Sequence, residues 1–444
     1  MQSSVPAPTR TARRAPADLP FSFATRELAE TLAAKRGEPE WLRDERLAAA
    51  DAFTSMPVEG NQLYTPYIDF RAAALDDVQP YVLDGPAGLG DDLKDLHLQE
   101  GVHVETMAQW LARDPGGFRA IVEGGATLPA NDKLAMLARG FWSHGRHVQV
   151  DAGVQVATPI QLRWPSAAPG RALMTRTVVT LGDGATAALV EEQVASGPPV
   201  ECAAGETVPQ GFFHGTTEVV LGAGARLEMA SIQDLPAEQI AFQHRHAAIG
   251  EGATLHWALA QLGGRLVRSR VDNRLEGDRS SVEQVEIVFA GEQQLFDLTS
   301  YTRHLGRDTT GNLLSKGALL DRSRSYMKGL ITIERSAVGT DSFLGEFGMN
   351  LSKAARAVAI PSLEIDQPDC RRAAHSSAVG PIDPTQLFYL ESRGIPPDEA
   401  RKFIVLGFLE PVVARVPLES ARDRLRDLLE EKWSAGLVAA AAAA

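Results

Sequence analysis

One short pattern that occurs three times constrains the fold of this chain more than any other feature of its sequence. Each copy has an aliphatic residue, then Gly-x-Gly-Ala, then a few residues of strand character, and the copies begin at Leu181, Leu221 and Ile249. A dinucleotide-binding loop would need a third glycine where Leu255 stands, and a P-loop would need Gly-Lys-Ser/Thr. A nucleotide site uses one such loop, whereas a stack of coils needs a corner at every turn. We therefore predict a β-solenoid with corners at Gly182, Gly222 and Gly250.

An alternation of apolar and polar residues from about 147 to 365 supports the same fold. This segment is rich in Val, Ile, Leu and Thr and poor in helix signals, which favours strands. The three corners are unevenly spaced, which excludes a tandem hexapeptide repeat of the left-handed type. A right-handed parallel β-helix tolerates such irregularity, and we predict one over residues 146–380. Because terminal coils expose unpaired backbone edges, we expect N-terminal helices to cap one end and another subunit to pair with the other.

Helical patterns flank the predicted core on both sides. Asp383 at the N-cap, Pro384 in the first turn and Gly394 after the last turn give the start and stop signals of a helix. Asn131 is the predicted N-cap of the last helix before the core. The predicted flanking segments are a disordered tail over 1–20, a mainly helical region over 21–145, a C-terminal helical domain over 381–436 and a low-complexity tail over 437–444.

The composition restricts the partners and the compartment. Lys and Arg total 44 and Asp and Glu total 57, so the net charge of −13 argues against nucleic acid or an anionic membrane as a partner. No apolar run reaches the roughly 18 residues of a membrane helix, and the N-terminus has no apolar signal-peptide core. The two cysteines, Cys202 and Cys370, provide no disulfide framework, so we expect a cytoplasmic protein. The usual catalytic signatures are missing, so we do not predict an enzyme.

Two distant blocks form a specific pair of motifs. These are "RGEPEWLRDERLAAADAF", which begins at Arg36, and "QLFYLESRGIPPDEARKFIVLGF", which begins at Gln386. The segments "LLSKGALLDRSRSYMKGLITIERSAVGTDSF" and "PSLEI" lie between them. Together they resemble the SufB/SufD family of iron–sulfur cluster assembly proteins over about residues 36–417. The region "LEIDQPDCRRAAHSSAVGPID" resembles the SufD branch, whereas the SufB branch carries a cysteine near the end of the β-helix and an acidic partner further on.

The resemblance places a candidate iron ligand at His375, which occupies the position of the family's histidine. The family's Gly-Ala-Thr after this histidine is replaced here by Ser-Ser-Ala. Some members carry a cysteine two residues before the histidine, where this chain has Ala373. Cys370 lies further upstream and does not inherit that role by default, so we treat it as the weaker metal candidate.

The resemblance also implies a complex. A β-helix core would pair with a SufB-like paralogue, and the C-terminal helices would dock a SufC-like ABC-type ATPase. A nascent iron–sulfur cluster would form at the SufB–SufD interface, transient and shared with the partner, with His375 as a cofactor-binding metal ligand and no cofactor tightly bound to the isolated chain. A neutral imidazole exchanges more readily than a thiolate, which suits temporary assembly. A homodimer of the isolated chain stays open as an alternative state.

Less specific roles compete with these assignments. His375 is equally compatible with a hydrogen bond at a subunit interface, and Cys370 with packing as a small, partly buried apolar residue. The "HRH" stretch at His244 and His246 has metal-binding spacing, but a solvated strand face is the favoured interpretation. His304 is predicted to pack or hydrogen-bond within the solenoid. We assign no role to Cys202.

Three classes of function therefore remain from the sequence. The leading one is a non-catalytic scaffold subunit for cluster assembly, either SufD-like or, as an alternative, the SufB-like subunit itself. A second is a β-helix enzyme of the acyltransferase or polysaccharide lyase class, against which the missing hexapeptides and the missing Arg/Asp/Lys cluster argue. A third is a self-associating structural solenoid without a ligand.

Overall fold

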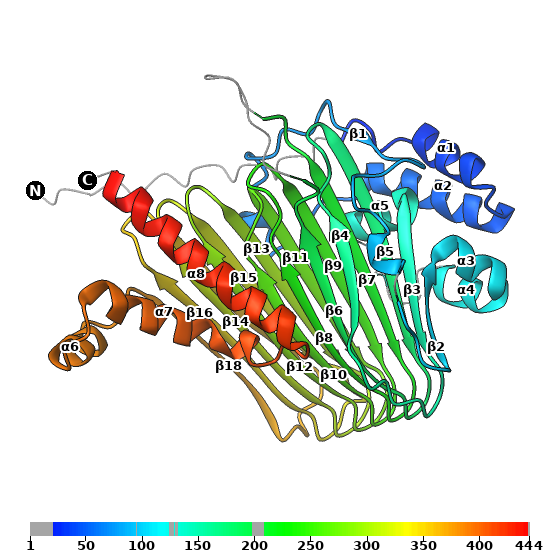
Figure 1. The fold of residues 1–444 in the computed structure, drawn as a ribbon. Coiled ribbons are helices and arrows are strands. Elements are labelled where there is room, and N and C mark those ends of the chain that lie inside the picture. Colours follow the sequence, from blue (N-terminus) through cyan, green and yellow to red (C-terminus); the bar gives the residue numbers. More distant parts are fainter. Residues whose placement is uncertain (1–20, 95, 124–127, 129–131, 198–207, 443–444) are drawn as a thin grey trace, which may run out of the picture.

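The computed structural model describes residues 21–442, apart from 95, 124–127, 129–131 and 198–207. Two of the sequence assignments, the cap at Asn131 and the residue Cys202, lie outside the described residues. The described part of the chain has a core of stacked strands, with helices on its two sides (Figure 1). No helix within this part is both long and apolar enough to cross a membrane.

The core consists of two sheets, and successive strands of the chain alternate between them. The first sheet contains β2 (Val102–Thr106), β3 (His144–Val150), β5 (Arg171–Leu181), β7 (Phe212–Leu221), β9 (Ile240–Ile249), β11 (Leu266–Leu275), β13 (Leu295–His304), β15 (Arg324–Ile333) and β17 (Arg356–Ile365), with β1 (Gln79–Pro80) beside β5. The second contains β4 (Ile160–Pro165), β6 (Thr186–Val194), β8 (Arg226–Gln233), β10 (Thr254–Gln261), β12 (Ser281–Ala290), β14 (Thr310–Leu319), β16 (Asp341–Asn350) and β18 (Arg372–Gly380).

Neighbouring strands in both sheets pair in parallel, and only β2 pairs antiparallel, with β3. The pairs keep one register over long stretches; for example, β11 aligns residue by residue with β9 and with β13. Because the chain returns to the first sheet after each strand of the second sheet, its successive strands form the stacked coils of a solenoid. This arrangement confirms the predicted parallel β-helix core.

The predicted corners at Gly182, Gly222 and Gly250 are confirmed, since each directly follows the end of a strand. These glycines are needed because the coils stack closely there. A Cβ on Gly182 would lie 2.6 Å from the backbone nitrogen of Ala152, and one on Gly250 would lie 2.6 Å from the carbonyl oxygen of Leu221. The positive φ belongs to the second glycine of each pattern, for example 63° at Gly252.

The same corner continues in coils that lack the Gly-x-Gly pattern. Arg279 and Asp308 take the positive-φ position, with φ of 58° and 54°. The N–H group at this position donates to a carbonyl of the next coil each time: Gly252 to Asp278, Arg279 to Arg307 and Asp308 to Val338. A ladder of hydrogen bonds therefore runs along this edge of the solenoid, including corners that the glycine pattern does not mark.

The N-terminal helices cover the outer face of the first sheet. They are α1 (Arg26–Arg36), α2 (Glu40–Ser55), α3 (Met107–Arg113), α4 (Pro115–Val122) and α5 (Lys133–Phe141). Apolar residues of α2 and α5, such as Phe53 and Phe141, share one buried cluster with Phe212 and Phe242 of the sheet. At the first coil, α3 packs on β2 and β3, so the strand stack is closed at this end.

The C-terminal helices cover the second sheet. α7 (Pro397–Val413) and α8 (Glu419–Ala442) cross its strands obliquely (Figure 1), whereas α6 (Pro384–Ser392) projects from the body. Val405 and Leu409 of α7 and Leu425 and Leu429 of α8 pack on the outward side chains of the sheet. The predicted start of α6 is confirmed, because the carboxylate of Asp383 accepts a hydrogen bond from the backbone N–H of Thr385.

Candidate functional site

The last coil leaves the solenoid open. β17 pairs with β15 on one side, and β18 pairs with β16 on one side, while no strand of the described residues pairs with their other edges. Residues of β18 are exposed or half-buried along its whole length, unlike those of the inner strands. Two large apolar side chains are exposed here, Ile365 at 46% and Val379 at 41%. This end therefore offers backbone donors and acceptors together with apolar surface.

His375 lies in the middle of β18, aligned with Leu344 of β16. Leu344 is fully buried and packs between the sheets with Leu313 and Ile331. Because aligned residues of parallel strands face the same way, His375 belongs to the interior-facing row, yet it is exposed because no further coil of the described residues covers it. Its imidazole makes no hydrogen bond or ion pair with the residues that the structure describes.

Cys370 precedes β18 at the corner of the same terminal coil. It is a free thiol, half-buried, and it packs on the apolar cluster that contains Ile333 and Ala337. The structure thus brings both predicted ligand candidates into the last coil. Within the described ranges, no group of three or more His, Cys, Asp or Glu residues is close enough together to hold a metal ion.

Glu346, which sequence reasoning missed, lies one coil inside this end. Its Oε2 accepts a hydrogen bond from the backbone N–H of Ile360 on β17, at 2.8 Å, so the carboxyl group links the two sheets. Burial raises the pKa of Glu346 to about 8. The only sequence signal is an acidic residue among glycines and aromatic residues in "FLGEFGMN". Gly329 on the facing strand leaves the space, since a Cβ there would lie 2.9 Å from Oε1 of Glu346.

The prediction of a solvated strand face for His244 and His246 is wrong. Both side chains are buried, at 0% and 1% exposure, in β9, whose Phe242 packs against the N-terminal helices. Nδ1 of His246 lies 3.3 Å from the carboxylate of Asp272, and Nδ1 of His244 lies 3.9 Å from that of Asp132. Burial lowers the pKa of both imidazoles. The sequence pattern could not show that a distant segment covers this strand.

The role predicted for His304 is confirmed. Its Nδ1 lies 2.8 Å from the hydroxyl of Thr309 and its Nε2 lies 3.0 Å from the hydroxyl of Ser342, so the ring joins neighbouring coils. The imidazole is fully buried, and burial lowers its pKa to about 4. His304 is therefore a neutral structural residue of the core.

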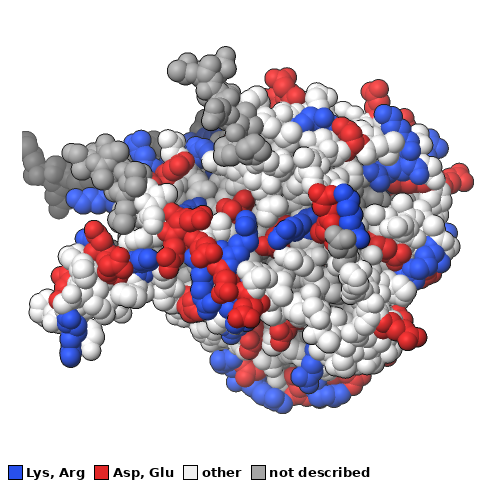
Figure 2. Space-filling model, viewed as in Figure 1, with Lys and Arg blue, Asp and Glu red and all other residues white. Residues whose placement is uncertain are grey.

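Aromatic side chains are exposed at a second place, on the C-terminal helices. Phe388 and Tyr389 of α6 are 71% and 57% exposed, and Phe403 of α7 is 60% exposed. α6 buries none of its residues, and Figure 2 shows a mostly uncharged surface on this projecting part. Exposed aromatic residues of this size are typical of protein contact surfaces. We call Phe388, Tyr389 and Phe403 the aromatic patch.

Comparison with known proteins identifies the family. The family described as "SUF system FeS cluster assembly, SufBD core domain" matches residues 164–408, which span β4 to α7. The iron–sulfur cluster assembly protein SufD of Bacillus subtilis is 29% identical over 301 residues, which cover 68% of this chain and 67% of that protein.

Two further relatives extend the match. An iron–sulfur cluster assembly SufBD family protein of Mycobacterium bovis is 29% identical over 75% of this chain and 79% of its own length. The iron–sulfur cluster assembly protein SufB of Bacillus subtilis is 23% identical over 89% of this chain and 90% of its own length. Since the matched family domain contains most of the strand stack, including the open end with His375, this chain belongs to the SufBD family of iron–sulfur cluster assembly proteins.

Proposed function

We propose that this chain is a non-catalytic, SufD-like scaffold subunit of a SufBCD-type complex. The observation that carries the proposal is the open end of the solenoid. Two strand edges that no described strand pairs with, exposed apolar residues and His375 lie there on one coil. Exposed strand edges of this length attract further strands. The partner that fits is a chain with a similar terminal coil. A SufB-like protein is such a candidate, because this chain matches both a SufD and a SufB protein over more than half of its length.

Pairing through this end can be tested with charges on the terminal coil. The variant Ile365→Lys/Val379→Lys places two ammonium groups where a partner strand would pack, which opposes pairing by desolvation and repulsion. We expect the variant to fold but to lose co-purification with a co-expressed SufB-like paralogue. Leu83→Lys is a matched control, because Leu83 is 59% exposed and lies in the N-terminal segment. Undiminished co-purification of the double variant would refute pairing through this end.

The proposed cofactor is a nascent cluster held transiently between the two subunits. His375 can supply one imidazole, and the remaining ligands come from the partner, since the described residues of this chain form no ligand group of three. Neutral imidazole binds iron and exchanges readily. The exposed ring of His375 is free to bind, whereas the packed thiol of Cys370 is less accessible.

The ligand role predicts a specific loss in the assembled complex. His375→Ala should leave the fold and the complex intact, because an exposed side chain contributes little to the core. Iron and acid-labile sulfide per complex should fall severalfold after co-expression of all three subunits. Cys370→Ala should have a much smaller effect. Normal cluster loading in the His375 variant would leave this histidine as an interface residue. Equal loss of iron and sulfide in both variants would contradict the ranking of His375 above Cys370 as a ligand.

The aromatic patch supports the second part of the proposal, docking of a SufC-like ABC-type ATPase on the C-terminal helices. α7 and α8 are held by the sheet beneath them, so α6 is presented on a rigid base. A partner that covers Phe388 and Phe403 would bury large apolar area, which is the main favourable term in association. No step of catalysis is assigned to this chain.

The SufB-like role is the second candidate, since the match to SufB covers more of this chain than the match to SufD. The two roles differ in the paralogue that is bound. A SufD-like chain should form a stable complex with a SufB-like protein, whereas a SufB-like chain should select a SufD-like one. Pairwise co-expression with each paralogue decides between them.

A further inference from the structure

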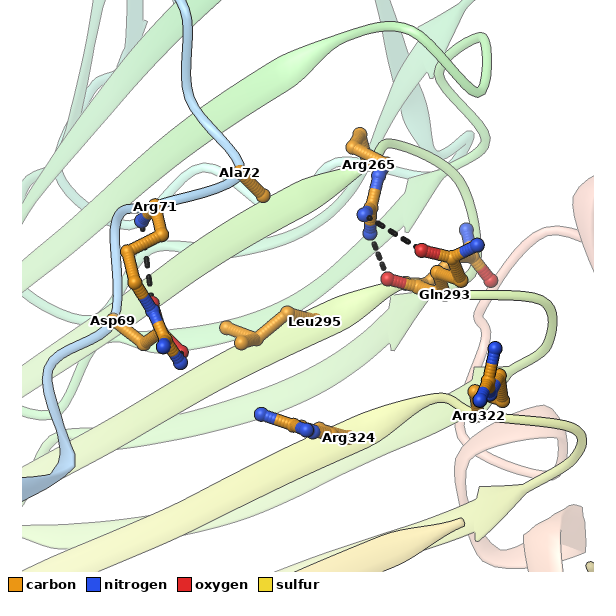
Figure 3. A pocket seen from close by; sticks show the side chains of 9 residues that line it. Asp69, Arg71, Ala72, Arg265, Gln293, Leu295, Arg322 and Arg324 are labelled. Atoms are coloured by element: carbon orange, nitrogen blue, oxygen red, sulfur yellow. Dashed lines mark hydrogen bonds and ion pairs between the residues drawn. The ribbon is translucent and has the colours of Figure 1, made fainter. Parts of the chain in front are cut away.

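A pocket on the outer side of the first sheet has a concentration of arginines. Its volume is about 450 Å³, and it lies where the N-terminal segment passes the beginnings of β11, β13 and β15 (Figure 3). Arg71 comes from the N-terminal segment, and Arg265, Arg322 and Arg324 come from the solenoid. Asp69 is the one carboxylate among the lining residues that the structure describes.

Among the residues that the structure describes, the four arginines of the pocket share one lining carboxylate, Asp69. Asp69 is engaged by Arg71, whose Nε donates to it at 2.8 Å, and this hydrogen bond lowers the pKa of Asp69. Arg265 donates to the backbone and side-chain oxygens of Gln293, which are neutral. The guanidinium groups of Arg322 and Arg324 form no hydrogen bond or ion pair with the residues that the structure describes.

The strand register adds a further like charge. Arg324 of β15 aligns with Arg356 of β17, so two exposed arginines stand side by side on neighbouring parallel strands, about 4.8 Å apart at the backbone. Like charges in such direct pairs destabilise a sheet. Arg356 likewise has no carboxylate partner in the described part of the chain. The protein as a whole is acidic, with net charge −13, so this region is a local exception. Its excess of positive charge attracts anions from solution.

We propose that this pocket binds a small molecule with at least two linked phosphate groups. Guanidinium groups match phosphate oxygens with paired N–H donors. Arg265 and Arg324 stand two strands apart in the stack, about 10 Å at the backbone, and the guanidinium of Arg265 leans onto Gln293 beside the strand between them. The guanidinium groups thus come from several strands, and a diphosphate offers them more oxygens on two linked groups than one phosphate does. Apolar lining is limited to Leu295 and Ala72, so charge dominates recognition.

The probe for this site is inorganic pyrophosphate, titrated into the full chain by calorimetry, with inorganic phosphate as the comparison. We expect pyrophosphate to bind more tightly than phosphate, and its affinity to fall as salt is raised. Arg322→Ala/Arg324→Ala should weaken pyrophosphate binding by about tenfold or more, because two charge-assisted contacts are lost. Arg335→Ala is the matched control, since Arg335 is exposed just beyond the other end of β15 and should not affect binding.

Thermal unfolding separates a lost site from a damaged fold. Without the anion, the double variant should melt no lower than the wild type, because a repulsive pair has been relieved. Pyrophosphate should raise the melting temperature of the wild type and of Arg335→Ala but not that of the double variant. Three results would overturn the proposal: no binding to the wild type, equal affinity for phosphate and pyrophosphate, or equal affinity in the double variant.

Discussion

At the scale of single residues, the corners of this solenoid use glycine for two separate reasons. Gly277 sits where coils touch, and a Cβ there would lie 2.1 Å from the backbone nitrogen of Glu251. Gly252 has open space around its Cα but needs a positive φ of 63°. The first requirement excludes every side chain, whereas the second only raises the energy of the backbone.

The two glycines therefore predict different costs of substitution. Gly277→Ala forces backbone atoms of adjacent coils apart and should lower the free energy of unfolding by about 3 kcal/mol or more. Gly252→Ala should cost only about 1 kcal/mol, the price of a left-handed alanine. Thermal or denaturant unfolding of the two variants checks the order. A larger loss for Gly252→Ala would show that close stacking is not what limits the corner.

The corner residues also show how far the sequence could predict the structure. The three Gly-x-Gly-Ala copies were sufficient to predict a solenoid. Arg279 and Asp308 occupy equivalent corners that keep the first glycine, Gly277 and Gly306, but lack the second. A hydrogen bond to the next coil holds each of them in an unfavoured conformation. Such tertiary stabilisation leaves no local pattern.

At the scale of elements, α6 differs from the two helices that follow it. α7 and α8 each bury an apolar face on the second sheet, and removing the whole segment would uncover that sheet. α6 buries no residue and keeps its aromatic side chains exposed. Point substitutions in the aromatic patch are therefore a cleaner test of docking than a deletion.

We expect Phe388→Glu/Phe403→Glu to abolish co-purification with a SufC-like ATPase. The buried faces of α7 and α8 are unchanged, so the melting temperature should stay within a few degrees of the wild type. Binding of the SufB-like paralogue should persist, because the patch lies outside the terminal strands. Leu83→Glu, at a similarly exposed position, is the control. Retained ATPase binding in the double variant would contradict docking on this patch.

Element-scale packing also explains which parts of the sites escaped prediction. Asp383 and Pro384 mark a helix start through local chemistry, so the sequence was sufficient there. Arg71 and Arg324 line the same pocket. His244 of β9 lies beside Asp132, at the start of α5. These contacts connect segments far apart in the chain, and no alternation or spacing rule relates them.

At the scale of the whole molecule, buried histidines make the fold sensitive to acid. Burial is the main cause that lowers the pKa of His144, His147, His214 and His304, each to about 4. In the unfolded chain these histidines take up a proton near pH 6.5, whereas in the folded protein their imidazoles stay neutral until about pH 4. Stability is therefore fully present above pH 6.5 and is lost as the pH falls from 6.5 to 4.

This sign predicts a melting temperature that falls steadily between pH 6.5 and 4. His304→Asn keeps some hydrogen-bonding capacity and removes one titrating group, so its melting temperature should depend less steeply on pH over this window. Melting curves in buffers of equal ionic strength provide the measurement. An equal slope in the variant and the wild type would exclude His304 as a contributor.

Glu346 acts in the opposite direction. Its pKa is raised to about 8 from an ordinary value of 4.5, so the folded protein holds one extra proton between these values. The stability from this proton is full below pH 4.5 and declines as the pH rises towards 8. Glu346→Gln should remove that decline, and a variant that is no more stable than the wild type at pH 8.5 would contradict the assignment.

The oblique course of α7 and α8 has a mechanical consequence. Their buried residues touch outward side chains from Val190 of β6 through Ala230, Ala258 and Val285 to Ala318 of β14, so the two helices lie on five strands at once. A pull on β18 would strip the stack one rung at a time, because each coil holds only its neighbours. A pull on α8 would be shared in shear by all of those rungs together. A force applied at the C-terminal helices would thus move the β-helix as a rigid body, while the same force applied at the last coil would unfold it coil by coil.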